Sequence, residues 1–228
     1  MQVNHNAGHK VQFGDYPRPV NIAFDTPLPK RLQGRHVLDL NKDAAVQLVA
    51  NKPALFRRLA EAEGVPMPDE WRALKSLEGD GGFDYPAYEE AFPQGTIMRG
   101  REGSKTLPTI GDLIDFLATK KDSNFVAISR PEHFRYGTIS VCPRLAKTVP
   151  YGVINASIST GDIPQKVFEA VTKAALATGV DYAQVSFFLI SGADGVERPC
   201  IVDISTRFSM ADAEGIAKLV RHSLGTRR

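Results

Sequence analysis

The last third of the sequence contains the pattern that most restricts the possible folds. Residues 164–178 have helical periodicity, begin with a proline and end at Gly179, a residue type that commonly closes a helix. Two apolar runs follow, at 182–190 and 200–206, and the segment between them contains Asp194-Gly195, which is typical of an antiparallel hairpin. This order is unlike a regular series of alternating strands and helices. We therefore expect an α+β fold with largely antiparallel sheets.

The segments before this hairpin predict a similar mixture. Asn41 is suited to cap a helix over residues 43–50, and Pro53 suits the first turn of a second helix that Gly64 ends. Residues 1–41 are rich in Pro, Asn and Gly and predict an extended arm with one short strand. The remaining predicted elements are strands at 96–99, 124–130, 136–142 and 151–158, a helix at 110–119 opened by Thr109 and Asp112, and a final helix capped by Ser209.

Charge and composition narrow the range of functions. The 28 basic and 26 acidic residues nearly balance, which argues against nucleic-acid binding, because such proteins carry a clustered basic face. No run approaches the roughly 20 apolar residues needed to span a bilayer, and residues 1–10 lack the apolar segment of a secretory signal. Cys142 and Cys200 lie in apolar runs, where cysteine usually packs as a small hydrophobic residue. We therefore expect a reduced, cytoplasmic protein.

Several familiar catalytic motifs are missing from the sequence. It has no glycine-rich nucleotide-binding pattern of the Rossmann or Walker type, and neither HExxH nor GxSxG. The five histidines form no metal-ligand spacing, and His5 and His9 lie in the N-terminal arm. Zinc catalysis and a Ser-His-Asp triad therefore have little support.

Lys52 is the first candidate for contact with an anion. It follows Asn51 at the predicted start of a helix, where the helix dipole disfavours a positive charge. A nearby anionic ligand would explain a lysine at this position. The simpler interpretation is a surface lysine that contacts no ligand.

Residues 96–105 supply a second group of candidates. The predicted strand ends at Arg99, whose guanidinium is suited to hold a phosphate oxygen by charge-assisted hydrogen bonds. Gly100, Gly103 and Ser104 follow it and would let backbone N–H groups approach phosphates. The alternative is a charged surface turn.

The predicted C-terminal hairpin carries candidate metal ligands. Asp203 and Ser205 are two residues apart and therefore project from one face of a strand, and Ser186 on the partner strand can lie across from them. Magnesium prefers hard oxygen ligands in an octahedron, usually carboxylates together with substrate phosphates and water. The alternative is that Asp203 is only a polar residue at the end of a strand.

The order and spacing of these segments resemble those of ATP-grasp enzymes encoded by bacteriophages, over roughly residues 20–220. The likeness rests on Asn51-Lys52 and on the stretches AEAEGVPMP, IMRGREGSK, EHFRYGTI, DYAQVS and VDISTR. It implies the ATP-grasp fold, with two α/β lobes of mixed, largely antiparallel sheets and a reduced N-terminal lobe. The implied division is an N-terminal arm and reduced region (1–41), a first lobe (42–130) and a second lobe with the metal-site hairpin (131–228).

The resemblance also implies roles for individual residues. On the strand at EHFRYGTI, side chains alternate between two faces, and Arg135 would point into the cleft and contact an acyl-phosphate. Lys147 matches a catalytic lysine on the following strand. The residues that would contact the phosphates of ATP are Lys52, Arg99, Gly100, Gly103 and Ser104, and those that would hold Mg²⁺ are Asp203, Ser205 and Ser186.

The sequence departs from the family at the metal site. The family has Asp, Glu and Asn where this chain has Ser186, Asp203 and Ser205, so one of two expected carboxylates remains. Near Asn155, Val153 occupies the place of a family arginine. The resemblance therefore implies that this chain binds magnesium more weakly than the family does.

The implied activity is ATP-dependent carboxylate–amine ligation through an acyl-phosphate. ATP and Mg²⁺ would be the cofactors, and small-molecule or peptide carboxylates and amines the substrates, with neither a nucleic acid nor a membrane as partner. The depleted metal site leaves an alternative, a catalytically inactive ATP-grasp scaffold that serves as a binding or virion-associated structural protein. A phage origin would place the protein in the cytoplasm of a bacterial host.

Overall fold

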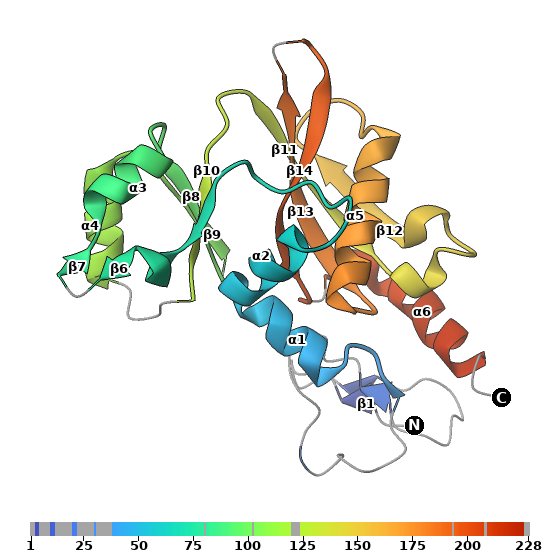
Figure 1. The fold of residues 1–228 in the computed structure, drawn as a ribbon. Helices are drawn as coiled ribbons and strands as arrows, with labels where there is room; N and C mark the ends of the chain where they lie inside the picture. Colours follow the sequence, from blue (N-terminus) through green and yellow to red (C-terminus); the bar gives the residue numbers. More distant parts are fainter. Residues whose placement is uncertain are drawn as a thin grey trace.

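Two lobes, each built on a four-stranded sheet, make up most of the part of the chain that the structure describes. This computed structural model describes residues 3–4, 10–11, 20–21, 30, 38–79, 81–101, 103–119, 124–192, 194–207 and 209–225. The first lobe lies at the left of Figure 1 and the second at the right, with helices between and below them.

The first lobe is an antiparallel sheet with helices on one face. Met98, Leu107 and Ala127 pack against Leu113 and Phe116 of the covering helix to form its core. The predicted capping box is confirmed, because Thr109 N–H donates to Asp112 and Asp112 N–H donates to Thr109 Oγ1. The sheet order is β5 (Trp71–Ala73), β10 (Val126–Ser129), β8 (Thr96–Gly100) and β9 (Gly103–Leu107), and its helices are α3 (Tyr85–Ala91) and α4 (Ile110–Thr119). The small elements beside them are η2 (Leu74–Leu77), β6 (Glu78–Gly79) and β7 (Gly82–Phe83).

The second lobe contains the predicted C-terminal hairpin. Its two long strands pair antiparallel, as the sequence predicts. The helix before them, α5 (Gln165–Thr178), ends at Gly179, whose φ of 71° is the left-handed conformation that favours glycine. The sheet order is β12 (Val153–Ile158), β11 (Phe134–Val141), β13 (Ala183–Ser191) and β14 (Glu197–Ser205). All pairings in the sheets of both lobes are antiparallel.

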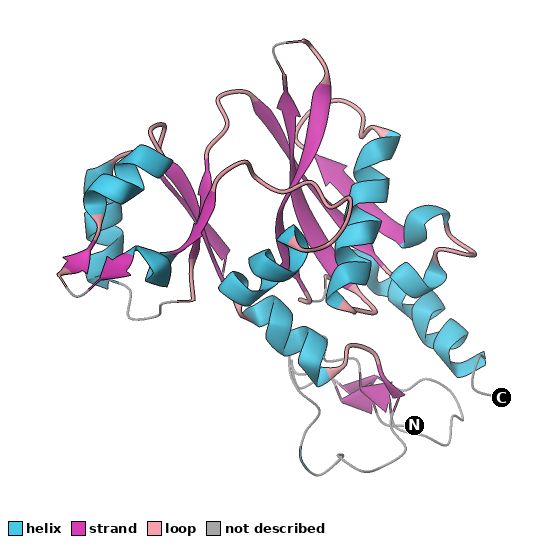
Figure 2. Cartoon of the chain, viewed as in Figure 1, coloured by secondary structure: helices cyan, strands magenta, loops and turns pink. Residues whose placement is uncertain are grey.

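The helices α1 (Asp43–Ala50) and α2 (Lys52–Ala60) pack with the second lobe. Their apolar residues join one core with α5 and with the face of the sheet that carries Val185 and Phe187. The first lobe of the expected division, residues 42–130, therefore includes two helices whose side chains belong to the core of the other lobe. The polypeptide crosses between the lobes twice, at residues 66–70 and 130–133, and Figure 2 shows both crossings as loops.

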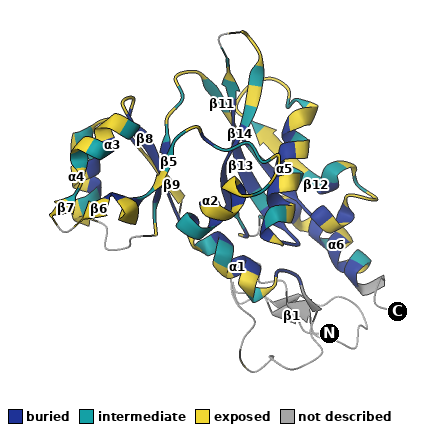
Figure 3. Ribbon diagram, in the orientation of Figure 1, coloured by how far each residue is buried: buried dark blue, intermediate teal, exposed yellow. Residues whose placement is uncertain are grey.

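The two sheets turn their remaining faces toward each other. Along β8, Met98 packs into the core of the first lobe, whereas Ile97 points the other way. Ile97 packs with Ile128, with Phe56 of α2 and with Phe188 of β13. Figure 3 shows dark-blue, buried segments in both β8 and β13, the strands that contribute Ile97 and Phe188 to this layer. Part of the space between the lobes is thus filled by apolar packing.

The described residues of the N-terminal region form a further four-stranded sheet of two-residue strands, where the sequence predicts an arm with one strand. Its order is β2 (Lys10–Val11), β1 (Val3–Asn4), β3 (Val20–Asn21) and β4 (Leu38–Asp39). The chain ends with η5 (Met210–Asp212), capped by Ser209 as predicted, and α6 (Ala213–Gly225). None of the helices among the described residues combines the length and the apolar character that a membrane crossing requires.

Asn41 does not cap α1. The N-cap residue is Lys42, which makes no side-chain cap hydrogen bond. The Asn41 amide instead accepts from the backbone N–H groups of Asp181 and Tyr182 and donates to the Tyr182 carbonyl, at 2.7, 3.1 and 2.9 Å. These groups lie at the buried start of β13, where backbone polar atoms need partners. Asn41 therefore joins α1 to the second lobe.

Replacing Asn41 with alanine should lower the free energy of unfolding by about 2–4 kcal/mol, because three buried backbone groups lose their partner. Denaturation in urea measures the loss. Asn155→Ala is the matched control, since Asn155 is exposed on β12, and we expect a change within about 0.5 kcal/mol. Equal effects of the two substitutions would contradict the joining role of Asn41.

Candidate active site between the lobes

Lys52 and Asp203 form a buried ion pair at the centre of the candidate site. The Lys52 side chain, at the first residue of α2, is 3% exposed, and its Nζ lies 2.7 Å from Asp203 Oδ1. The same Nζ donates to the Ile204 carbonyl at 2.8 Å. Asn51 caps α2 by accepting from Ala54 N–H, which fixes where the lysine side chain begins. Lys52 is therefore no surface lysine.

Strand pairing brings Ser186 and Asp203 together. Ser186 on β13 pairs with Asp203 on β14, whereas Phe188 pairs with Cys200, so β14 has one extra residue between these pairs. This irregularity places Asp203 and Cys200, three positions apart, on the same side of the sheet. That side faces the first lobe. Ser205 pairs with Gln184 one step further along the same strands.

Arg99 of the first lobe reaches the same region. It lies on the side of β8 that faces the second lobe, is 4% exposed, and its Cζ lies 5.9 Å from the centre of the Tyr136 ring. The Tyr136 hydroxyl and Ser186 Oγ share a hydrogen bond of 3.0 Å. Arg99 Nε is buried and has no hydrogen-bond partner among the described residues. A buried guanidinium left without an anion is costly, which points to a ligand that supplies one.

Two more arginines stand beside Lys52. Arg101, at the turn after β8, and Arg207, just after β14, line a small cavity of about 40 Å³ together with Lys52 and Ser205. Both arginines are exposed, and neither forms an ion pair with the described residues. Basic groups from both lobes and from α2 therefore converge on one place.

Two positions of the β8–β9 hairpin, Gly100 and Gly103, favour glycine for different structural reasons. Gly100 pairs with Gly103 across the hairpin end. A Cβ at Gly100 would lie 2.3 Å from the Phe125 ring, so packing alone requires glycine there. Gly103 has a φ of 144° with no neighbouring atom within 4 Å of a Cβ position. Ser104 is exposed and pairs with Arg99. A contact between this hairpin and a phosphate stays a prediction.

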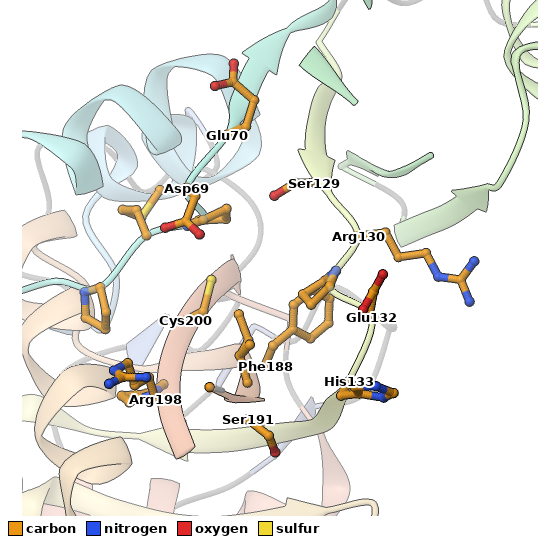
Figure 4. Close-up of a pocket in the computed structure, with 17 residues that line it drawn as sticks. Asp69, Glu70, Ser129, Arg130, Glu132, His133, Phe188, Ser191, Arg198 and Cys200 are labelled. Carbon is orange, nitrogen blue, oxygen red and sulfur yellow. The ribbon is translucent and has the colours of Figure 1, made fainter. Parts of the chain in front are cut away.

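A larger pocket opens between the two crossings. Its volume is about 870 Å³, within the range of small-molecule sites. Figure 4 shows Phe188 and Cys200 at its floor, with Asp69 on one crossing and Glu132 on the other. Burial raises the pKa of the Cys200 thiol to about 12, so this cysteine stays protonated and packs as the sequence predicts. Along β13 the pocket floor leads directly to Ser186.

Arg135 lies on the opposite face of the sheet from the one expected. The alternation along the strand is as predicted, but Tyr136 faces the first lobe and Arg135 faces the α5 side. Its guanidinium donates two hydrogen bonds to Glu197, at 2.9 and 2.7 Å, and others to the carbonyls of Thr160 and Asp162. The hydrogen bond from Arg135 holds the pKa of the Glu197 carboxyl below its ordinary value. The expected position of Arg135 in the cleft is thus wrong, and its contacts are structural.

Lys147 also lies away from the expected position. It is exposed in a turn between η3 (Pro143–Leu145) and η4 (Pro150–Gly152), whereas a strand was expected there. Two prolines, Pro143 and Pro150, lie at the starts of these short helical turns and favour them over a strand.

The residues expected to hold magnesium lie near one another, and each already makes a hydrogen bond within the protein. Asp203 accepts from Lys52, Ser186 bonds with Tyr136, and Ser205 Oγ accepts from the Arg207 N–H at 3.2 Å. Within the described ranges, no three His, Cys, Asp or Glu side chains form a group that could hold a metal ion. Because Lys52 pairs with the single carboxylate among these three residues, the donor set fits a divalent cation poorly.

Comparison with known proteins gives a fold but no family. No family model matches the sequence, and no curated protein is similar to it at a significant level. The D-alanine–D-alanine ligase of Bacillus anthracis superposes with a TM-score of 0.64 and 17% identity, over 93% of this chain and 80% of that one. The ATP-grasp ligase PsnB superposes with a TM-score of 0.55 and 16% identity, over 82% and 62% of the two chains.

A third similar structure is N5-carboxyaminoimidazole ribonucleotide synthetase of Thermotoga maritima, with a TM-score of 0.59 and 13% identity, over 90% of this chain and 58% of that one. The predicted ATP-grasp fold is therefore confirmed. Sequence reasoning missed Tyr136, Arg101 and Arg207 as members of the site, although each lies in a segment that carried the resemblance.

Proposed function

We propose that this chain binds ATP between its lobes and uses it to join a carboxylate to an amine. The observation that carries the proposal is the convergence of Lys52, Arg99, Arg101 and Arg207 from both lobes beside a pocket of about 870 Å³. A nucleoside triphosphate has the matching shape, with a flat uncharged base at one end and clustered negative charge at the other.

The spacing within the sheet supports this placement of the ligand. At the pocket floor, Phe188 lies two positions from Ser186 along β13, and Cys200 lies three positions from Asp203 along β14. At about 3.3 Å per residue, the two ends are roughly 7–10 Å apart. That separation suits a base and ribose in the pocket with the phosphates beside Lys52 and Arg99.

Structures with the same fold support ATP and the substrate class. The Bacillus anthracis D-alanine–D-alanine ligase was also solved with ATP, and PsnB with a precursor peptide and AMPPNP or with Mg and ADP. By analogy, the substrates here are small-molecule or peptide carboxylates and amines. The resemblance to phage-encoded proteins would place the reaction in a bacterial host cytoplasm.

The proposed reaction has two steps. A carboxylate oxygen attacks the γ-phosphorus of ATP, ADP leaves, and an acyl-phosphate forms. An amine nitrogen then attacks the acyl carbon, phosphate leaves, the nitrogen gives up a proton, and an amide remains. The cationic side chains would balance the charge that builds up on the phosphate oxygens, and the two lobes would hold the reactants in contact.

A second candidate function is a nucleotide-binding scaffold without turnover, acting as a binding or virion-associated structural protein. The Lys52–Asp203 ion pair favours it, because the one carboxylate at the centre of the site is already neutralised. Both candidates require a nucleotide in the cleft, so binding is the first property to test.

ATP should raise the unfolding temperature, whereas adenosine at the same concentration should change it little. A ligand present at about 100 times its dissociation constant adds about 2.7 kcal/mol to the free energy of unfolding. Thermal unfolding is measured with each compound, with and without MgCl₂. The absence of a shift with millimolar ATP in both buffers would refute the proposal. ADP formation that requires both an amino-acid or peptide carboxylate and an amine would identify the ligase, and binding without turnover the scaffold.

A further inference from the structure

The phosphate end of the cleft is rich in cations and poor in carboxylates. Lys52 and Arg99 are buried there, and Arg101 and Arg207 stand at its exposed edge. Asp203 is the one carboxylate that contacts this group among the described residues. The fixed charge of the site is therefore positive before any ligand binds.

The position of Lys52 disfavours a metal ion on Asp203, because the ammonium already neutralises this carboxylate. A divalent cation on the other carboxylate oxygen, Asp203 Oδ2, would lie close to the Lys52 ammonium, which donates to Oδ1 at 2.7 Å. The Lys52 side chain is 3% exposed, and its ammonium also donates to the Ile204 carbonyl. The ammonium is therefore fixed beside Asp203. Two positive charges within contact distance of one carboxylate would repel each other strongly in a buried site.

The surroundings of Arg99 indicate that the site lacks an anion. The Arg99 side chain is buried, its Nε has no hydrogen-bond partner among the described residues, and its Cζ lies 5.9 Å from the centre of the Tyr136 ring. A cation–π contact offsets only part of the cost of removing such a charge from water. An anion beside Arg99 would satisfy the donors and neutralise the charge.

We infer that this cleft holds the phosphates of its nucleotide directly through Lys52, Arg99, Arg101 and Arg207, without a divalent cation. The inference rests on the proposed nucleotide cleft and specifies the form of ligand it takes, a nucleoside polyphosphate free of metal. Magnesium cancels part of the negative charge of ATP, so it should weaken binding to a cationic site. A site that coordinates the metal through carboxylates gives the opposite dependence.

Calorimetric titration of the full chain with ATP tests this, in EDTA and in excess MgCl₂ at equal ionic strength. We expect the dissociation constant of ATP to be about tenfold lower in EDTA than in MgCl₂. Tighter binding with MgCl₂, equal binding in both, or binding only with MgCl₂ would overturn the inference while leaving the proposed function intact. No binding in either buffer would overturn both.

Two variants at the exposed edge of the site provide an independent test of the inference. Arg101→Gln and Arg207→Gln should each weaken ATP binding in EDTA by about three- to tenfold and reduce its dependence on salt. Lys105→Gln is the matched control, because Lys105 lies on the same hairpin but its Nζ sits over Phe116 of the first-lobe core, at 5.8 Å. If Lys105→Gln lowered the affinity for ATP as much as the arginine variants do, the effect would come from general charge attraction. That result would overturn the inference.

Asp203→Asn separates the two ways of holding phosphate. Asparagine keeps the shape and an acceptor oxygen for Lys52, so the chain is expected to fold. If Asp203 instead coordinated magnesium, its loss would weaken the binding of ATP in MgCl₂. We expect the variant to bind ATP at least as tightly as the unchanged protein, because it removes the one negative charge in the cluster. A tenfold loss of affinity would contradict the inference.

Discussion

Lys52→Ala is expected to lower the free energy of unfolding by about 3–5 kcal/mol, which would be a large share of the stability of an ordinary domain. The substitution leaves the buried Asp203 carboxylate without the cation that lies 2.7 Å away, and the Ile204 carbonyl without its 2.8 Å donor. Truncation of the lysine stem adds a packing defect between α2 and β14. Urea denaturation followed by circular dichroism measures the change.

A second variant shows that the loss comes from the unpaired charge. When Lys52→Met and Asp203→Leu are combined, no buried charge remains, and we expect most of the stability to return. Lys42→Ala is the control for loss of a lysine near the same helices, because Lys42 is exposed and caps α1 without a side-chain hydrogen bond. A loss below about 1 kcal/mol in Lys52→Ala would show that the ammonium is solvated.

The elements with long, regular patterns were predictable from the sequence. The C-terminal hairpin, the helix that Gly179 ends and the capping box at Thr109 all follow from local rules that involve a few adjacent residues. The Gly- and acid-rich residues 72–95 predicted no element, because this region forms only strands of two or three residues, one helical turn and one short helix. Such elements are too short to show a period, although Asp84 does cap the helix there by accepting from Ala87 N–H.

The position of Arg135 shows what alternation does not determine. A period of two residues says that Arg135 and Tyr136 face opposite sides of the sheet. It does not say which side meets the other lobe, because both sides of this sheet are covered. One side packs on α5 and the other packs partly on the first lobe, so both carry apolar residues. Contacts between segments far apart in the sequence determine which face of the sheet meets the first lobe.

Long-range pairs were the other part that the sequence did not reveal. Lys52 and Asp203 were each singled out, but as a phosphate contact and a metal ligand, and their mutual ion pair spans 151 positions. Asn41 has its partners 140 and 141 residues away, and a local rule assigned it to the nearest helix instead. Capping and propensity rules describe neighbours in the chain and contain no information on such distances.

Arg99→Met is expected to change stability and nucleotide binding in opposite directions. Without nucleotide, the variant should be more stable by about 1–2 kcal/mol, because methionine fills similar apolar space and removes a buried, unpartnered Nε. Its affinity for ATP should fall about 100-fold, since two charge-assisted hydrogen bonds to phosphate are lost at roughly a factor of ten each. Urea denaturation without ligand and calorimetric titration with ATP measure the two effects.

Arg72→Met is the matched control for the loss of a first-lobe arginine. Arg72 lies on β5 of the same sheet, is 52% exposed, and pairs with Glu70 at 2.9 Å. Exposed pairs of this kind contribute about 0–1 kcal/mol, so stability should change little and ATP affinity not at all. A loss of stability in Arg99→Met would show that the guanidinium stabilises the contact between the lobes through Tyr136. The buried charge would then need no phosphate to explain it. A gain in stability together with a loss of affinity would mean that the folded protein keeps an unfavourable charge in order to bind its ligand, as expected of a binding residue.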